Sequence, residues 1–241
     1  MAIYEFLSFD SQLFGFPVAK IIPERMTSPN LLAALNELKD KGIKLVYWCS
    51  DRSDKVSQLA AQEAKGLLTD EKVTYLVSLA DIKNKLAGVM WEVYDESNAL
   101  PTQELIELSF SVANNSRFSK DNLMPVDLRN KMYEQWIVNS CNRTIAKEVF
   151  VTREENHIIG MVTAGEKNGR GDIGLLAVNS NYLGRGLGVK LVRMAQAYFY
   201  KNNFKQVQVV TQKDNIAACK LYEKCDFKLE KIQNFYHFWL S

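Results

Sequence analysis

The sequence is poor in the residues that metal and nucleophile chemistry require. It has only two histidines, His157 and His237, so neither an HExxH zinc motif nor a Ser-His-Asp triad finds a match. Its four cysteines form no CxxC pair, which argues against a zinc site or a redox dithiol. We therefore expect a protein without a bound metal.

The chain also lacks long apolar runs and a strong charge of either sign. No apolar stretch approaches the roughly 20 residues of a membrane-spanning helix, and the opening MAIYEFLSFDSQLFGF has no basic region before an apolar core, as a secretory signal would. A net charge of +2 gives no electrostatic case for nucleic acid or an anionic membrane. We expect a cytoplasmic protein that binds neither of these. Its 241 residues suit one large domain or two small ones.

Apolar periodicity predicts alternating strands and helices in the first hundred residues. Leucines recur at helical spacing between residues 31 and 38, and a second helix is predicted over residues 54–64. Each is followed by an apolar strand, KLVYWCS and VTYLVSL. This alternation is typical of a mostly parallel sheet.

The pattern weakens between Tyr94 and Leu123, and we place a domain boundary near Asn98 to Thr102. This divides the chain into an N-terminal α/β domain, residues 1–100, and a second domain, residues 101–241. The second begins with an amphipathic helix, LRNKMYEQWIVNS, followed by the strands EVFVTRE, HIIGMVTAGE and DIGLLAV. The apolar FYHFWL, predicted to end an antiparallel hairpin, indicates either the covered edge of a homodimer or core packing.

A weak internal similarity links the two domains. KLVYWCSDRSDKVSQLAAQEAKGLLTDEKVTYLV and KQVQVVTQKDNIAACKLYEKCDFKLEKIQNFYHFWL share the order strand, helix, strand and a similar length. One hypothesis is a duplicated half that kept the sheet and lost a ligand site. The alternative is two ordinary strand–helix–strand units.

The segment YLGRGLGVKL contains three alternating glycines, Gly184, Gly186 and Gly188, between a predicted strand and a predicted helix. It matches neither the Walker A loop nor the GxGxxG dinucleotide fingerprint. A glycine loop entering a helix N-terminus exposes backbone N–H groups that bind anions. Arg185 could add a charge-assisted contact, although a plain tight turn would use glycines as well.

This loop and a later segment resemble the GNAT superfamily of acyl-CoA-dependent N-acyltransferases. LLAVNSNYLGRGLGVKLV and VVTQKDNIAACKLYEKCDF follow the family order of loop, helix, strand and second helix, over about residues 130–241. Gly186 and Gly188 match the two glycines of the family loop. Leu183 stands where the family usually has Gln or Arg. Four positions match the family's last helix: Asn215, Ala218, Leu221 and Tyr222.

The resemblance implies an acetyl-CoA or other acyl-CoA site. It implies that the end of one strand pairs with pantetheine, that the glycine loop holds the pyrophosphate, and that Asn215 hydrogen-bonds the pantetheine arm. The implied cofactor-binding residues are Leu176, Ala177, Val178, Leu183, Gly184, Arg185, Gly186, Leu187, Gly188, Val189 and Asn215.

The resemblance also assigns two catalytic positions, Tyr222 as general acid and the Val178 backbone N–H as oxyanion donor. A phenol with a pKa of about 10 is protonated at neutral pH and can donate to a leaving thiolate. The alternative for Tyr222 is a core aromatic at helical spacing. The sequence identifies no general base. The acidic candidates Glu148, Glu166 and Asp172 lie in or beside strands, where a solvated strand edge is the alternative, and water can serve as the base instead.

Three further segments, SFDSQLFGFPVAKI, SRFSKDN and KMYEQWIVNS, resemble the TDP-fucosamine acetyltransferase family. This implies a bacterial cytoplasmic enzyme that acylates the amine of a TDP-linked amino-dideoxyhexose. It implies an α/β protein in which a GNAT fold with a mixed central sheet follows a smaller α/β domain, the degenerate GNAT-like half of the duplication hypothesis. Whether the sugar amine is at C3 or C4 stays open, as does whether the acyl group is acetyl or a longer one such as hydroxybutyryl.

Arg117 is our candidate for the substrate diphosphate and Phe118 for a wall of the same site. The alternative is a solvent-exposed arginine beside a phenylalanine that anchors the loop. Tyr133 and Trp136 are expected in the core. Two rival functions are a GNAT enzyme acting on a peptide, polyamine or antibiotic, and a non-catalytic acyl-CoA sensor.

Overall fold

The computed structural model describes residues 2–94 and 100–240. Its helices and strands follow in the order β1 (Tyr4–Phe6), α1 (Ser8–Phe14), β2 (Val18–Ile21), α2 (Ser28–Asp40), β3 (Leu45–Asp51), α3 (Lys55–Glu63), β4 (Leu67–Ser78), α4 (Leu79–Leu86), β5 (Glu92–Val93), α5 (Gln103–Ala113), α6 (Val126–Cys141), β6 (Glu148–Glu154), β7 (His157–Lys167), β8 (Arg170–Val178), η1 (Ser180–Tyr182), α7 (Leu187–Lys201), β9 (Gln206–Gln212), α8 (Ile216–Lys224) and β10 (Lys228–Trp239).

Local sequence signals account for several of these elements. Asp54 caps α3, because its carboxylate accepts hydrogen bonds from the Val56 and Ser57 amides. The β6–β7 hairpin closes through Glu155 and Asn156, whose positive φ angles of 47° and 72° suit a tight turn. The predicted helices and strands therefore form where capping and turn residues favour them.

The strands of the described residues form one mixed sheet in the order β1-β2-β3-β10-β4-β9-β8-β7-β6-β5. Only β2–β3 and β8–β9 pair in parallel. The mixed sheet is confirmed, whereas the mostly parallel arrangement expected for the first hundred residues is wrong. The reason is that β10 lies between β3 and β4 and runs antiparallel to both.

The strand order is symmetric about the β10–β4 pair. β1, β2, β3 and β10 on one side match β7, β8, β9 and β4 on the other, and each set pairs antiparallel, parallel and antiparallel in turn. Helices α2 and α3 occupy the same places in the first half as α7 and α8 in the second. Each half therefore gives its last strand to the other, which supports the duplication hypothesis.

The first half lacks the chemistry of the second. Asp54 and Asn215 both cap the helix that precedes the exchanged strand. Seven residues further on, the second half has Tyr222 and the first has Ala61. No glycine loop precedes α2.

β10 also explains the apolar end of the chain. The strand is not part of a terminal hairpin, and it contributes Phe235 to one core cluster and Tyr236 and Phe238 to another. Core packing thus accounts for the apolar residues that suggested a homodimer edge. A division into residues 1–100 and 101–241 stays a prediction. Its boundary falls partly on residues 95–99, outside the described residues, while the sheet combines strands from both parts.

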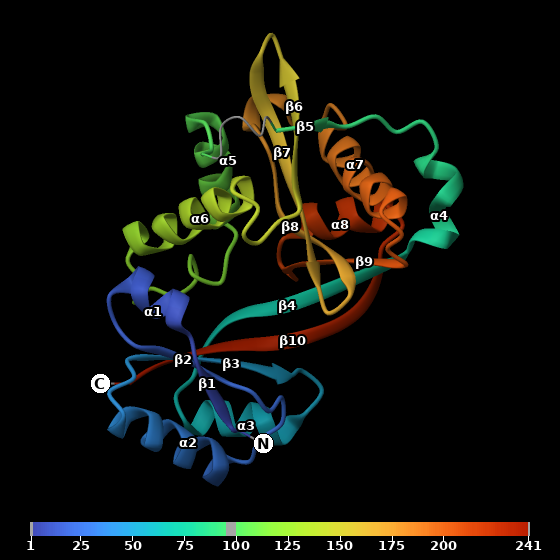
Figure 1. Cartoon of the computed structure of the whole chain (residues 1–241). Coiled ribbons are helices and arrows are strands. Elements are labelled where there is room, and N and C mark those ends of the chain that lie inside the picture. Colours follow the sequence, from blue (N-terminus) through green and yellow to red (C-terminus); the bar gives the residue numbers. More distant parts are fainter. Residues whose placement is uncertain (1, 95–99, 241) are drawn as a thin grey trace.

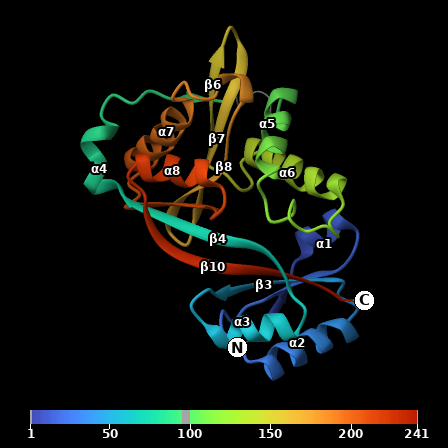
Figure 2. The ribbon, with the colours of Figure 1, turned by 180° about the vertical axis from the view of Figure 1, so that it is seen from behind.

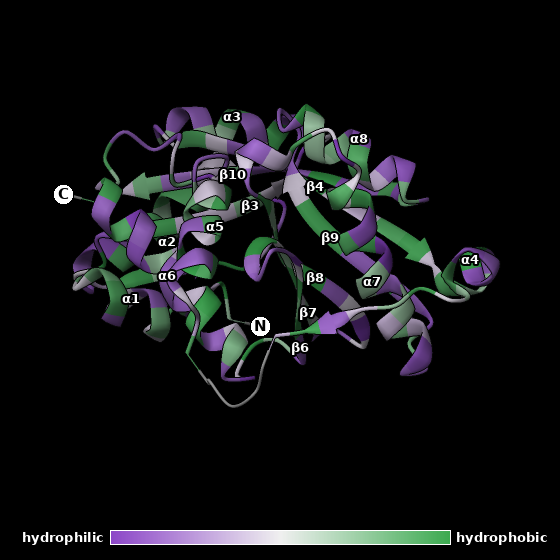
Figure 3. Ribbon diagram, turned by 90° about the horizontal axis from the view of Figure 1, so that it is seen from above, coloured by the Kyte–Doolittle hydropathy of each residue, from purple (hydrophilic) through white to green (hydrophobic). Residues whose placement is uncertain are grey.

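Helices cover both faces of the sheet (Figures 1 and 2). Helices α1, α5 and α6 lie on one face, while α4, α7 and α8 lie on the other; α2 and α3 cover the end of the sheet nearest the N-terminus. Apolar residues concentrate in the strands between these layers (Figure 3).

A buried polar group fastens the α5–α6 segment to β10. Asp121 accepts hydrogen bonds from His237 Nδ1 at 2.6 Å, from Trp239 Nε1 at 2.9 Å and from the Leu123 amide at 2.9 Å. The side chains of Asp121 and His237 are fully buried. Burial alone would raise the pKa of Asp121, but these hydrogen bonds hold it below its usual value. The carboxylate thus stays ionised at neutral pH.

Replacing Asp121 with alanine should destabilise the fold by about 2–4 kcal/mol, because buried donors on His237 and Trp239 lose their acceptor. Thermal unfolding at pH 7 measures the effect. Asp127→Ala, an exposed position in the first turn of α6, is the matched control and should change the stability by less than about 1 kcal/mol. Equal unfolding temperatures for the two variants would contradict this role for Asp121.

Candidate functional site

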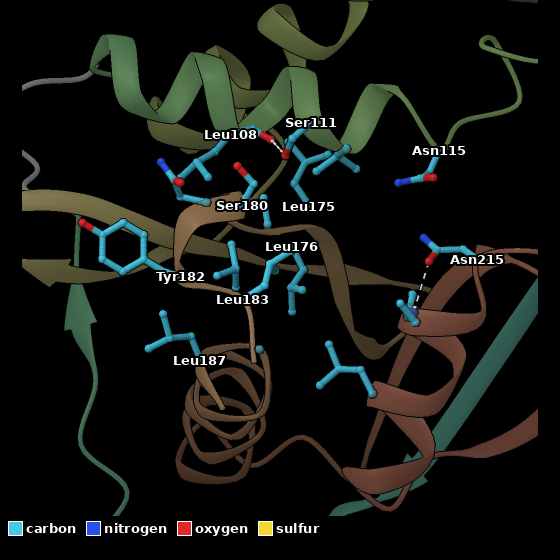
Figure 4. Close-up of a pocket in the computed structure, with 18 of the residues that line it drawn as sticks. Leu108, Ser111, Asn115, Leu175, Leu176, Ser180, Tyr182, Leu183, Leu187 and Asn215 are labelled. Carbon is cyan, nitrogen blue, oxygen red and sulfur yellow. Dashed lines mark hydrogen bonds between the residues drawn. The ribbon is translucent and has the colours of Figure 1, made fainter. Parts of the chain in front are cut away.

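A cleft of about 1150 Å³ opens between α5 and α6 on one side and α7 and α8 on the other. Its floor is the second half of β8, and its ends are closed by the glycine loop and by β9. Asn115 and Asn215 face each other across one end (Figure 4). The cleft therefore contains the two regions that the sequence singles out, the loop and the last helix.

The cleft exists because β8 and β9 separate. They pair in parallel only where Gly171–Ile173 meet Val207–Val209, although β8 continues to Val178. A bulge places Gly174 and Leu175 opposite Thr163 of β7, and the Leu175 amide donates to Thr163 Oγ1 at 2.8 Å. A Cβ on Gly174 would lie 2.8 Å from the same oxygen, so glycine is required there. Bulges bend a strand away from its neighbour.

The free edge of β8 presents alternate backbone groups to the cleft. The Asn179 amide donates to the Ile159 carbonyl of β7 at 2.8 Å. Because polar groups of a strand point to opposite edges in alternation, the N–H groups of Val178 and Leu176 face the cleft. Ala177 lines the cleft, but its backbone faces β7. The predicted pairing edge is therefore formed by residues 176 and 178.

The glycine loop enters α7 in a conformation that needs glycine. Gly184 and Gly186 both have φ of 79°, in the left-handed region. Gly186 precedes α7, whose first-turn N–H groups have no intrahelical acceptor. Gly188 serves packing, because a Cβ there would lie 3.1 Å from Leu221 Cδ2 of α8. The loop and the helix N-terminus together form an anion site at the wall of the cleft.

Arg185 does not point into this anion site. Its guanidinium pairs with Glu154 at 3.3 Å and lies over the Tyr182 ring, 4.8 Å from the centroid. Leu183, Leu187 and Val189 line the cleft, and Arg185 does not. The predicted contact of Arg185 with phosphate stays a prediction, and in this structure the side chain is engaged with Glu154 and Tyr182.

Asn215 and Tyr222 lie on the cleft side of α8. The side-chain oxygen of Asn215, Oδ1, caps the helix by accepting a hydrogen bond from the Ala218 amide at 3.1 Å. Tyr222 is 5% exposed and packs against Tyr75 and Phe227, with ring centroids 6.2 and 5.8 Å away. Burial raises the pKa of its phenol far above the ordinary value. The phenol consequently remains protonated at any physiological pH.

Arg117 and Phe118 have different environments. Arg117 is half-buried and lines the cleft, with its guanidinium 4.2 Å from the Phe118 ring centroid and 4.7 Å from that of Phe235. Within residues 2–94 and 100–240 no carboxylate lies within ion-pair distance of it. Phe118 is 1% exposed and does not line the cleft. The structure places it in the core, where it supports Arg117, and its role as a wall of the substrate site stays a prediction.

Other polar groups reach the cleft that sequence reasoning placed elsewhere. Tyr133 and Trp136 of α6 line it together with Gln212 of β9. Helical periodicity identifies the inward face of α6, but it does not separate core residues from cleft residues. None of the three base candidates, Glu148, Glu166 and Asp172, lines the cleft.

Among residues 2–94 and 100–240, no group of three or more His, Cys, Asp or Glu side chains could hold a metal ion. No helix in the same ranges is long and apolar enough to cross a membrane.

Comparison with known proteins agrees with this geometry. Residues 116–227 match the Acetyltransferase (GNAT) family, whose members use acetyl-CoA. The spore coat polysaccharide biosynthesis protein SpsD of Bacillus subtilis is 24% identical over 138 residues, 57% of this chain and 47% of that protein. The dTDP-fucosamine acetyltransferase of Escherichia coli is 32% identical over 134 residues, 53% of this chain and 57% of that protein. The chain spans about half the length of these curated relatives.

Solved structures share the fold across almost the whole chain. The match to a GCN5-related N-acetyltransferase from Sphaerobacter thermophilus covers 99% of this chain and 76% of that chain, with a TM-score of 0.57 and 11% identity. The match to a tandem GNAT protein from the clavulanic acid biosynthesis pathway covers 94% of this chain and 76% of that chain, with a TM-score of 0.56 and 11% identity. The likeness extends through the first half as well as the matched domain.

Replacing Gly186 with alanine tests the anion site. Any residue with a Cβ costs about 1–2 kcal/mol in the left-handed conformation, so thermal stability should fall. Affinity for acetyl-CoA, measured by calorimetry, should fall about tenfold, which corresponds to about 1.4 kcal/mol. Gly169→Ala in the β7–β8 turn, with φ of 75°, is the matched control: it should lose similar stability and keep full affinity. Equal affinity losses in both variants would contradict the assignment.

Proposed function

We propose that this protein, in which residues 116–227 form a GNAT acetyltransferase domain, transfers an acyl group from acyl-CoA to the amine of a TDP-linked amino-dideoxyhexose. The observation that carries the proposal is the composition of one cleft. It combines an unpaired strand edge and an anion-binding loop with an arginine that has no carboxylate partner among the described residues.

The chain offers a suitable group for each part of acyl-CoA. The first-turn amides of α7 would hold the pyrophosphate. The free edge at Leu176 and Val178 would pair with the pantetheine amides, and the Asn215 side chain lies beside that path. Acyl-CoA supplies the thioester that the acceptor amine attacks.

Two groups of the chain assist the transfer. The Val178 N–H faces the cleft and would stabilise the oxygen on which negative charge develops. The Tyr222 hydroxyl would give its proton to the departing thiolate as the carbon–sulfur bond breaks. Burial keeps the phenol protonated at neutral pH, so the hydroxyl has a proton to give when the thiolate departs.

The acceptor class is inferred from Arg117 and from two relatives. A guanidinium binds phosphate oxygens in a bidentate manner, and Arg117, which packs on three aromatic rings, lines the cleft without an ion pair to a carboxylate of the described residues. One relative is named as a dTDP-fucosamine acetyltransferase and another as a polysaccharide biosynthesis protein. A nucleotide diphosphate beside Arg117 would place a sugar amine toward the free edge of β8.

A thiol-release assay with acetyl-CoA and longer acyl-CoAs, against TDP-3-amino and TDP-4-amino dideoxyhexoses, tests the proposal directly. Turnover with one pair identifies the sugar position and the acyl group together. Acyl-CoA binding without turnover of any of these sugars would overturn the acceptor assignment, and peptide amines and polyamines are the comparison substrates.

Tyr222→Phe should reduce kcat roughly 10²-fold or more, because a positioned acid contributes about that much to a rate. The ring packing is retained, so the dissociation constant of acetyl-CoA and the unfolding temperature should not change. Rapid-quench measurement of the acyl-transfer step gives the rate. A variant with normal kcat would favour a packing role for the tyrosine, and an acyl-CoA sensor would show no turnover in either form.

Arg117→Gln should raise the KM for the nucleotide sugar about 10–100-fold, because a hydrogen bond to a charged group contributes about 1.5–3 kcal/mol. The KM for acetyl-CoA should stay the same. Arg170→Gln, which removes a surface ion pair with Glu230, is the control. Steady-state kinetics with both substrates varied decides the matter, and an unchanged KM for the sugar would refute a diphosphate contact.

A further inference from the structure

An acidic side chain lies behind the acceptor side of the cleft, the part lined by Arg117, Tyr133 and Gln212. Asp70 of β4 is 6% exposed, and its Oδ1 atom is buried without a hydrogen-bond partner. In the sheet Lys72 pairs with Gln212. Because residues two apart on a strand share a face, Asp70 lies on the Gln212 side of the sheet.

The neighbours of Asp70 come from every element packed around it. Gln212 of β9 hydrogen-bonds the carboxyl group. The charged or titratable neighbours are Arg117 and Lys120 from the α5–α6 segment, Asp214 from the β9–α8 turn, and Tyr133 from α6. Lys120 forms an ion pair with Asp214. Asp70 therefore faces one cation that is already paired and one, Arg117, that opens into the cleft.

The fold gives no reason for an acid at this position. A buried carboxylate with an unpaired oxygen is costly, and asparagine would keep the hydrogen bonding to Gln212 without the charge. Burial raises the pKa of Asp70 to about 7, which outweighs the opposing effects of Lys120 and Arg117. Such a group near a cleft is a candidate for proton transfer, and a base functions best when its pKa is near the working pH.

We propose that Asp70, which lies behind the cleft lining, is the base that accepts the proton of the acceptor amine through one water molecule; this rests on the proposed function. The ammonium group first gives a proton to the carboxylate. The neutral nitrogen then forms a bond to the thioester carbon, and the carbon–sulfur bond breaks. The thiolate takes the proton of Tyr222, the nitrogen loses a second proton that restores the phenol, and Asp70 releases its proton to solvent.

The pH dependence of the reaction should follow from this role. Above a pH of about 7 Asp70 is ionised and accepts a proton, whereas below it the carboxyl is neutral and the rate falls. Stability should change in the opposite direction. Because the pKa in the folded state exceeds the unfolded value of about 3.9, the stability contributed by the neutral carboxyl is lost as the pH rises toward and through 7.

Asp70→Asn separates this role from a structural one. We expect kcat to fall about 10²-fold, the acid limb of the pH profile to disappear, and the affinity for acetyl-CoA to remain. The unfolding temperature at pH 8 should rise, and it should rise less at pH 5. Asp70→Glu should recover part of the rate together with an acid limb. Asp172→Asn is the control, since this other buried acid has a raised pKa but its hydrogen-bond partner, Gln208, does not line the cleft, whereas Gln212 beside Asp70 does.

A normal rate or a retained acid limb in Asp70→Asn would overturn the proposal, as would a lowered unfolding temperature at pH 8. If the wild type turns over no TDP-amino sugar, the proposed function fails separately. Asp70 is then judged on the hydrolysis of acetyl-CoA, in which the attacking water must also lose a proton. If the pH profile of acetyl-CoA hydrolysis also lacks an acid limb that depends on Asp70, the role of Asp70 as a base is refuted.

Discussion

The early end of the hydrogen bonding between β8 and β9 is the constraint on which the site depends. Three residue pairs hold the strands together, and beyond Ile173 the bulge at Gly174 turns β8 away. An unpaired strand edge inside a protein is normally a liability, because its N–H and C=O groups need partners. Here the same unsatisfied groups are the means of binding an extended amide-containing ligand. The cleft and its chemistry therefore have a single origin in the sheet.

The exchange of β4 and β10 makes the two halves of the molecule one unit. Each half of the sheet contains the last strand of the other half, so the halves share one continuous sheet. The first half lacks a glycine loop and has Ala61 where the second has Tyr222. What it retains is the sheet, and with it β4, which brings Asp70 next to β9 and the acceptor side of the cleft. Through strand exchange the first half thus places a strand beside β9, which lines the cleft.

Burial has opposite uses on the two faces of the cleft. On α8 it raises the pKa of Tyr222, so the phenol is protonated at neutral pH. On β4 it raises the pKa of Asp70 to about 7, so the carboxyl can exchange a proton near neutrality. Aromatic packing around Arg117 holds a permanent charge between them. All three environments cost folding free energy and are sustained by the large shared core.

Features that depend on a few neighbouring residues could be predicted from the sequence. The glycine loop, the helix cap at Asn215 and the placement of Tyr222 two turns later are local, because capping and helical periodicity act within about seven residues. The position of β10 was not accessible, since an apolar run has the same appearance in a terminal hairpin and in the middle of a sheet. Residues 117 and 118 are adjacent, and the sequence placed both in the substrate site. The fold directs the first into the cleft and the second into the core. Asp70 is 142 residues from Gln212 in sequence, and only the pairing of β4 with β9 brings them together. Local chemistry was determined by the sequence, while the tertiary structure decided which strands became neighbours and hence which polar groups share the cleft.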